Sequence, residues 1–337
     1  ARKGQVVSVL TKVVVGGLVV VLLAGTIAFA VTKRGGADDP RSPSLPTPTM
    51  EPVVSPRSHP RFLDLRTGER TAIPRSITSL GPTDLRVSDD GAKLAFVGGG
   101  AQIYVANIDG TGVRQLTQTD AVVKDPHWSP DGSRIVFTAS GRVYIVDVST
   151  RVVTPLTRDL GLVWEPNFSA DGRTIVFTVA PATSDWKWLA LWSVPADRGR
   201  PHELMTKAAL GTHSPDGRTI AFLCVALPGD GHVWIDPQRL LLADADGSDR
   251  RGLLASDHEG ECGGGGEFWS WTFEQPDWSP DGRRIAFADG VGSFVPGSSK
   301  VRIVNVATGD MSIVGRGLHP SWVDGHTLII EQPESHT

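Results

Sequence analysis

The stretch DPHWSPDGSRIVF, residues 125–137, decides how this sequence folds. An extended run ends in Ser129-Pro130-Asp131-Gly132, and a second apolar run follows at once. Proline presets φ at the first turn position, and glycine adopts the left-handed conformation that closes a bulged hairpin. The stretch therefore predicts two antiparallel strands joined by a tight turn.

The same turn recurs along the chain. Asp-Gly pairs stand in comparable settings from residues 90, 131, 171, 216 and 281, with a degenerate copy from residue 324. Most lie 40 to 45 residues apart, with one gap of 65 residues. A second hairpin follows each of the first five turns, whereas the sixth such hairpin, Arg61–Ile73, precedes the first turn. This offset predicts an all-β, six-bladed β-propeller over residues 60–337, in which the N-terminal hairpin completes the last blade.

The repeated WSPDG turns, followed by an IVF- or IAF-like strand, resemble the WD-like repeats of TolB-type propellers over nearly all of residues 60–337. The resemblance implies a six-bladed propeller of the bacterial cell envelope that binds proteins and is not catalytic. This chain departs from TolB in its apolar N-terminal run and in having no separate α/β domain before the propeller. Similar propellers accompany the hydrolase domain of prolyl-oligopeptidase-type enzymes, but the sequence contains no GxSxG nucleophile motif.

Residues 13–31 read VVVGGLVVVLLAGTIAFAV and carry no charge. As a helix they would span roughly 28 Å, close to the hydrocarbon thickness of a bilayer. We therefore expect residues 1–34 to hold a single-pass membrane anchor, with a signal peptide cleaved after Ala30 as the alternative. The Pro-, Ser- and Thr-rich residues 35–59 predict an extended spacer, which would hold the propeller on the extracytoplasmic side.

Composition excludes some functions. The net charge of −4 is mildly acidic, so we expect no nucleic-acid partner. Cys224 and Cys262 are the chain's two cysteines, and without a CxxC motif they indicate either one disulfide or two thiols. The sequence indicates no cofactor, no metal motif and no catalytic set, and we expect a monomeric propeller.

Aromatic residues suggest where a ligand binds. Trp128, Trp278, Trp322 and Phe168 stand at the aromatic position of the repeat and should pack between blades. Other aromatic residues lie in connections expected on one face of the propeller, namely Trp164, Trp186, Trp188, Trp234, Phe268, Trp269, Trp271 and Phe273. Exposed aromatic side chains suit recognition of a protein, a peptide or an envelope polymer. The alternative is that these connections bury their own aromatic side chains as a lid.

A second candidate site comes from aligning the residues that enter the innermost strand of each blade. The aligned positions are Asp84, Asp125, Glu165, Leu210, Gln275 and His319. Six-fold repetition should gather them at one end of the central channel, where the acids make the mouth negative. Such a mouth suits a cation, a metal or a basic peptide end, whereas the plainer alternative is that each acid caps backbone amides.

These observations favour a non-catalytic, membrane-anchored binding module. One alternative is a propeller enzyme of the lactonase or lyase type, with a metal held at the channel mouth. Another is a sensor whose cytoplasmic output segment precedes the first residue of this sequence.

Overall fold

A computed structural model describes residues 12–15, 18–23, 26–30, 58–158, 160–180, 189–226, 234–253, 275–289 and 299–333. The chain divides into two compact units, Ala1–Pro56 and Arg57–Thr337.

The first unit holds an antiparallel sheet of three strands, in the order β1 (Lys12–Val15), β2 (Leu18–Leu23) and β3 (Thr26–Ala30). The membrane helix predicted over residues 13–31 is therefore replaced by strands. Valine, isoleucine and threonine are branched at Cβ and fit an extended backbone better than a helix, which explains the difference. Among the residues that the structure describes, no helix is long and apolar enough to cross a membrane.

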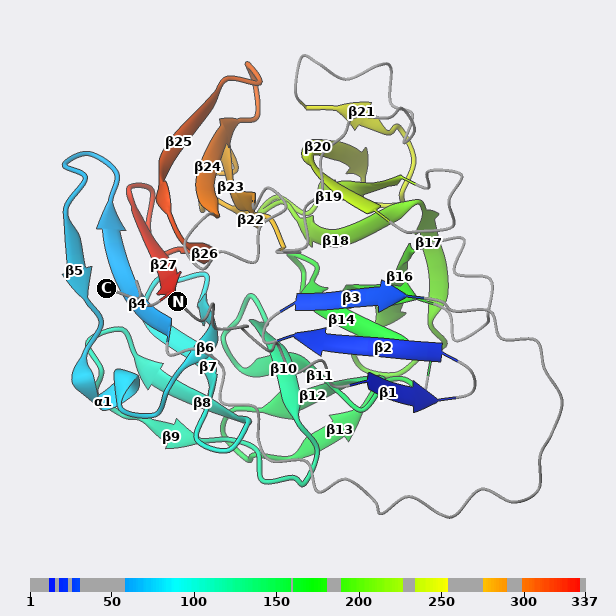
Figure 1. The fold of residues 1–337 in the computed structure, drawn as a ribbon, viewed down its shortest axis with the longest axis horizontal. Helices are drawn as coiled ribbons and strands as arrows, with labels where there is room; N and C mark the ends of the chain where they lie inside the picture. The colour runs from blue at the N-terminus through cyan, green and yellow to red at the C-terminus, as the bar shows by residue number, and fades with distance from the viewer. Residues whose placement is uncertain are drawn as a thin grey trace, which may run out of the picture. The chain divides into compact units, whose positions relative to one another are not determined.

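The second unit contains six antiparallel sheets of four strands each, here called blades 1 to 6 (Figure 1). Blade 1 consists of β6 (Thr83–Val87), β7 (Lys93–Gly98), β8 (Gln102–Asn107) and β9 (Arg114–Gln115). Blade 2 consists of β10 (Val123–Trp128), β11 (Arg134–Ala139), β12 (Arg142–Asp147) and β13 (Val153–Pro155). Blade 3 consists of β14 (Leu162–Phe168), β15 (Thr174–Ala180), β16 (Ala190–Pro195) and β17 (His202–Thr206).

The remaining blades follow the same order from the inner to the outer strand. Blade 4 consists of β18 (Ala208–His213), β19 (Thr219–Ala226), β20 (Trp234–Asp244) and β21 (Arg251–Gly252). Blade 5 consists of β22 (Asp277–Trp278), β23 (Arg284–Asp289), β24 (Lys300–Asn305) and β25 (Met311–Arg316). Blade 6 combines β26 (Leu318–Trp322) and β27 (Thr327–Pro333) with β4 (Ser58–Asp64) and β5 (Arg70–Ala72), and the short helix α1 (Arg75–Thr78) leads on to blade 1.

The blades form a ring. Strand β27 pairs with β4, so that Thr327 lies opposite Asp64 and Pro333 lies opposite Ser58. The innermost strands contact one another in a cycle, from β6 through β10, β14, β18, β22 and β26 back to β6 (Figure 1). The six-bladed, all-β propeller predicted from the repeat is confirmed.

The Ser-x-Asp-Gly turns show why this motif repeats. In blade 2, the Ser129 hydroxyl donates to Asp131 Oδ1 at 2.6 Å, and Asp131 also accepts from the Ser133 N–H at 3.0 Å. The Arg134 N–H donates to Ser129 Oγ at 2.9 Å, and Gly132 takes the left-handed φ of 66°. Four other turns repeat the 2.6 Å Ser–Asp contact. The motif therefore closes each hairpin through its own side chains.

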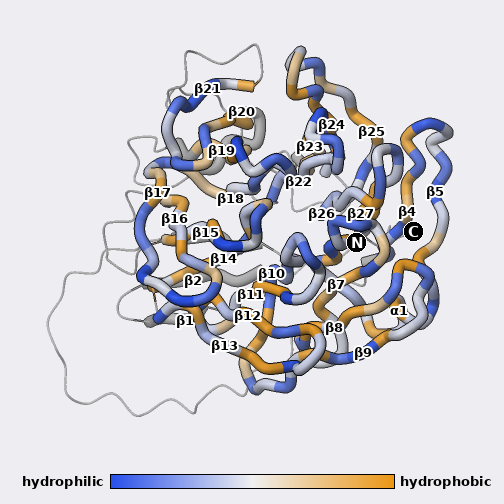
Figure 2. The backbone as a smooth tube through the Cα atoms, turned by 180° about the vertical axis from the view of Figure 1, so that it is seen from behind, coloured by the Kyte–Doolittle hydropathy of each residue, from blue (hydrophilic) through white to orange (hydrophobic). Residues whose placement is uncertain are grey.

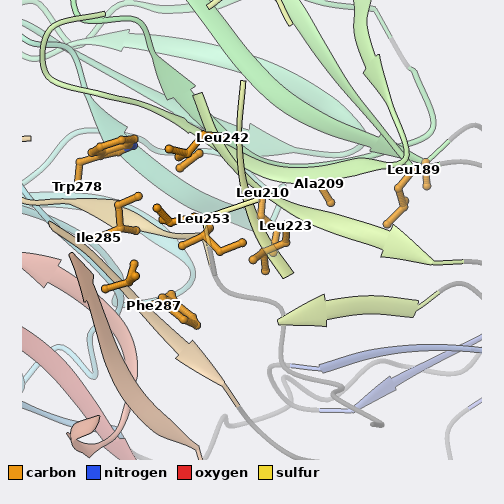
Figure 3. Close-up of a cluster of buried hydrophobic side chains, with 13 residues drawn as sticks. Leu189, Ala209, Leu210, Leu223, Leu242, Leu253, Trp278, Ile285 and Phe287 are labelled. Atoms are coloured by element: carbon orange, nitrogen blue, oxygen red, sulfur yellow. The ribbon is translucent and has the colours of Figure 1, made fainter. Parts of the chain in front are cut away.

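The hydrophobic core lies between neighbouring blades. Trp128, Trp278 and Trp322 are buried, and each indole N–H donates to a backbone carbonyl of the preceding blade, at 3.1 to 3.2 Å. Figure 3 shows one cluster, in which Trp278 and Phe287 of blade 5 gather with Leu210 and Leu223 of blade 4. In Figure 2 the hydrophobic colour follows strands in the middle of the blades, such as β8, β11 and β12. The prediction that the repeat's aromatic residues pack between blades is confirmed.

Candidate binding site at one end of the propeller channel

A β-bulge occurs at the same place in the innermost strand of five blades. The strand register shifts between Thr83 and Arg86 in blade 1, and at the equivalent point in blades 2, 3, 4 and 6. The bulge residues have φ values between 45° and 58°, and they are Asp84, Asp125, Glu165, Leu210 and His319. These are five of the six positions that the sequence alignment selected for the channel mouth. The sixth, Gln275, lies two residues before the start of β22.

Each bulge holds its residue in a left-handed backbone conformation that costs a non-glycine residue about 1–2 kcal/mol. Side chains of the preceding blade stabilise this conformation by accepting hydrogen bonds from the backbone N–H groups that the bulge leaves unpaired. Thr178 Oγ1 accepts from the Leu210 N–H at 2.8 Å, and Asp125 Oδ2 accepts from the Glu165 N–H at 3.3 Å. The bulges thus lock neighbouring blades together while re-aiming one side chain from each strand.

The bulges lie at the end of the propeller where the second and third strands of each blade connect. Thr83 pairs with Val97, next to the β7–β8 connection, and Lys124 pairs with Thr138, next to the β11–β12 connection. In blade 3, Leu162 at the start of β14 pairs with Ala180 at the end of β15. We call the bulge residues together with Gln275 the bulge ring.

Arg86 is a buried cation beside the bulge ring, and the sequence pattern did not predict it. It lies two residues after Asp84, and its guanidinium Nη2 is 3.3 Å from Glu165 Oε2, with both side chains buried. The equivalent positions in other blades hold His127, Asn167 and Thr212. The signal available in the sequence was an arginine at a position where these other blades have a smaller residue.

Blades 3, 4 and 5 close part of the ring. The buried Gln275 side chain donates from Nε2 to the Glu165 carbonyl at 3.2 Å and to the Gly211 carbonyl at 2.7 Å. Leu210, the only apolar member of the ring among the described residues, is completely buried. This sector is therefore filled by the side chain of Gln275, which bridges blades 3, 4 and 5, and by the aliphatic side chain of Leu210.

Blades 6, 1 and 2 form the open sector of the ring. The Asp84 and His319 side chains are 23% and 22% exposed, and His319 Nε2 lies 3.8 Å from Asp84 Oδ1. Glu331 of β27 lies behind them, with Oε2 3.4 Å from His319 Nδ1 and Oε1 accepting from the Leu85 N–H. Asp125 is half-buried, and its Oδ2 also accepts from the Thr138 hydroxyl at 2.8 Å.

The electrostatics of the ring follow from burial and from crowding of carboxylates. Burial, with the nearby Asp125 carboxylate, raises the pKa of Glu165 to about 8, although Arg86 opposes this shift. Burial and the Asp84 carboxylate likewise raise the pKa of Asp125. Burial raises the pKa of Asp277 to about 6. Burial alone would lower the pKa of Arg86, but the surrounding carboxylates raise it, so this guanidinium stays charged.

Four carboxyl groups thus act electrostatically on Arg86, namely Glu165, Asp277, Asp84 and Glu331, and Asp125 adds a fifth beside Glu165. Carboxyl groups therefore outnumber cationic side chains around Arg86, and the negative mouth expected from the sequence stays a prediction. Within the described ranges, however, no group of three or more His, Cys, Asp or Glu side chains is placed to hold a metal ion. The carboxylates instead accept bonds from Arg86, from backbone N–H groups and from hydroxyls.

The predicted aromatic surface is described only in part. Trp164 lies in strand β14 and not in a loop, pairs with Thr178, and packs partly buried against the cluster in Figure 3. Trp234 begins strand β20 opposite Ala226 and therefore lies in a strand and not in a connection. The other predicted aromatic residues lie outside the described residues: Trp186, Trp188, Phe268, Trp269, Trp271 and Phe273.

Cys224 is buried in blade 4 at the end of the propeller that carries the bulge ring, and it pairs with Ala208 on the neighbouring strand. It is disulfide-bonded. Cys262 lies outside the described residues.

Known proteins resemble this chain mainly in fold. Residues 86–225 match the family model described as TolB beta propeller domain. The putative TolB of Agrobacterium tumefaciens has a TM-score of 0.62 and 16% identity, over 83% of this chain and 99% of that one. The TolB of Acinetobacter baumannii has a TM-score of 0.55 and 20% identity, over 80% of this chain and 67% of that one.

A curated relative matches a short stretch. The uncharacterized peptidase YuxL of Bacillus subtilis (strain 168) is 44% identical over 62 residues, which is 17% of this chain and 9% of the relative's length. The match therefore spans a small part of that protein.

Proposed function

We propose that this chain, which carries a TolB-like β-propeller, is a non-catalytic binding module. Its ligand is a protein, a peptide or a cell-envelope polymer, bound at the end of the channel that carries the bulge ring. The observation that carries the proposal is the open sector of blades 6, 1 and 2, where polar side chains remain partly exposed around a buried charge network.

The charge of the open sector supports a ligand with a cationic group. Asp84 and Asp125 lie on neighbouring blades, close enough for the Asp84 carboxylate to raise the pKa of Asp125. Their repulsion is relieved when a cation comes near, because an opposite charge favours the ionised form of both acids. A lysine or arginine side chain, or a peptide amino terminus, has this chemistry.

The contacts within the ring support a role in binding. Arg86 and Glu165 are buried against each other, and the hydrogen bonds of the Gln275 side chain join blades 3, 4 and 5. A preorganised surface loses little conformational entropy when a ligand docks. The predicted loop aromatic residues would extend this surface, and they remain a prediction.

The proposal places the propeller outside the cytoplasm. The disulfide at Cys224 supports this location, because disulfides persist in oxidising compartments and are rare in the cytosol. A phosphatase that is active only outside the cytoplasm, fused after residue 333, is expected to be active in cells. An inactive but stable fusion would contradict the location.

The binding proposal is tested with the double variant Asp84→Asn and Asp125→Asn. Asparagine keeps the size of each side chain and an acceptor oxygen, so the bonds from Thr138 and Glu165 are preserved. The matched control is Asp109→Asn with Asp246→Asn, which removes the same charge from exposed turns of the outer hairpins.

Each purified full chain is immobilised, incubated with an envelope extract, and its bound proteins and polymers are identified. The ring variant is expected to lose the partner that the wild type and the control retain, at an unchanged melting temperature. Equal capture by all three proteins would refute a role for the ring. Equal loss in the ring variant and the control would show only non-specific charge attraction. Trp269→Ala with Trp271→Ala, in the same assay, tests the loop prediction.

A further inference from the structure

The outer edge of blade 5 differs from the outer edges of the other blades. An edge strand has unpaired N–H and C=O groups, and proteins usually protect such edges with short strands, charges or proline. Strands β9 and β21 have two residues each, β5 has three, β13 contains Pro155, and β17 contains His202 and Glu203. Strand β25 has six residues and no charge before Arg316.

Strand β25 also exposes apolar side chains beside its free edge. Met311 is 43% exposed and Ile313 is 53% exposed. They alternate along the strand and therefore lie on one face of the sheet. The exposed Val153 is the first residue of β13 and the exposed Val152 precedes it, but Pro155 interrupts the edge of that strand.

The ladder between β24 and β25 shows which backbone groups of β25 have no strand partner among the described residues. The Asn305 N–H donates to the Asp310 carbonyl at 2.9 Å. Bonded and non-bonded pairs alternate along antiparallel strands, so the Ile303–Ser312 pair is bonded, whereas Met311 and Ile313 turn their N–H and C=O groups outward. The two residues with exposed apolar side chains are thus the two whose backbone groups are available.

We propose that the edge of β25 is an interface at which two copies of this chain pair through an isologous, antiparallel strand contact. In the register that opposes Met311 to Ile313 of the second copy, two-fold symmetry generates the same contact twice. Four backbone hydrogen bonds form, and the exposed apolar side chains meet across the joined strands.

The charges at the ends of β25 favour a second copy in antiparallel orientation. Asp310 precedes the strand, and Arg316 ends it. Antiparallel pairing brings the acidic end of each strand toward the basic end of the other, whereas parallel pairing would bring like charges together. The strand is therefore complementary to itself. This proposal differs from the monomer expected from the sequence, and it is independent of the bulge ring.

The test compares the full-length wild type with Ile313→Lys and with the control Val153→Lys. Lysine is a natural protecting residue on edges, and both positions are exposed on outer strands, so neither substitution disturbs the core. Sedimentation velocity over a concentration series gives the dimerisation constant of each protein. Ile313→Lys is expected to weaken dimerisation by about tenfold or more, and Val153→Lys to leave it unchanged.

Amide hydrogen exchange provides a second, residue-specific measurement. As the wild-type concentration rises, exchange at Met311 and Ile313 is expected to slow, while Ser312, already bonded to β24, changes little. A wild type that stays monomeric throughout the series would overturn the proposal. A dimer that Ile313→Lys leaves intact, or one without protection at Met311 and Ile313, would also overturn it.

Discussion

Replacing Arg86 with methionine tests the charge network beneath the bulge ring. The Arg86 guanidinium lies 3.3 Å from Glu165, and Asp277, Asp84 and Glu331 also act on it electrostatically. Methionine fills similar space without charge, so the variant leaves several buried carboxyl groups uncompensated. Removing one partner of a buried ion pair costs about 3–5 kcal/mol, and we expect a loss of this size in the free energy of unfolding above about pH 8, where the Glu165 carboxyl group is ionised.

The converse substitution, Glu165→Gln, is expected to cost much less. Arg86 keeps its other acidic neighbours, and glutamine can still accept from the guanidinium, so the loss is about 1 kcal/mol. The surface control is Arg251→Met, which breaks contacts to Asp244 and Asp249 at an exposed site and should change stability by less than about 1 kcal/mol.

The pH dependence of the Arg86→Met defect has a definite sign. The pKa of Asp277 is about 6 and that of Glu165 is about 8 in the folded wild type, and removal of the cation raises both further. Acids with raised folded-state pKa values bind protons more strongly when folded, so lowering the pH stabilises the variant relative to the wild type. The defect should therefore shrink in two steps as the pH falls, first toward about 8, where folded Glu165 binds a proton in both proteins, and then toward about 6, where folded Asp277 does.

Urea unfolding followed by tryptophan fluorescence measures these differences at each pH. A cost for Arg86→Met no larger than that for Glu165→Gln would refute the idea that one arginine compensates several acids. A defect that grows as the pH falls would refute the assignment of buried, proton-binding carboxyl groups.

Three further predictions concern the scaffold. Trp278→Phe removes the indole bond to the Thr212 carbonyl and some buried area, and should lower the unfolding free energy by about 1–3 kcal/mol in urea titrations. Asp131→Ala removes the acceptor of the turn and should cost about 1 kcal/mol. Because hydrogen bonds, first of all that from Ser129, lower the Asp131 pKa from 3.8 to about 2, its contribution is present above 3.8 and disappears as pH falls through 2, so acid unfolding should be less steep in the variant. Cys224→Ala should lower stability by about 2–4 kcal/mol and abolish the destabilising effect of dithiothreitol, as calorimetry would show.

The fold could be predicted because the signal is local and repeated. The Ser-x-Asp-Gly turn is closed by hydrogen bonds among its own residues, as Ser129 and Asp131 show. Each copy therefore predicts a hairpin without reference to the rest of the chain. Counting from the turn also located Asp84, Asp125 and His319, because every bulge lies at nearly the same distance before its turn.

The partners of those residues could not be predicted. Arg86 and Glu165 are 79 positions apart, and Leu85 and Glu331 are 246 positions apart, so each contact depends on how blades meet around the ring. The sequence predicted a carboxylate-rich mouth but not Arg86, whose positive charge compensates the buried carboxyl groups. The N-terminal helix was predicted from hydropathy, which does not distinguish a helix from valine-rich strands such as β2.

The most direct test of the proposed function is the affinity of the identified partner for the wild type and for the Asp84→Asn and Asp125→Asn variant. The account predicts that the ring variant binds at least about tenfold more weakly, while the Asp109→Asn and Asp246→Asn control binds like the wild type. Wild-type affinity in the ring variant, with its fold intact, would contradict the claim that this end of the channel is the binding site.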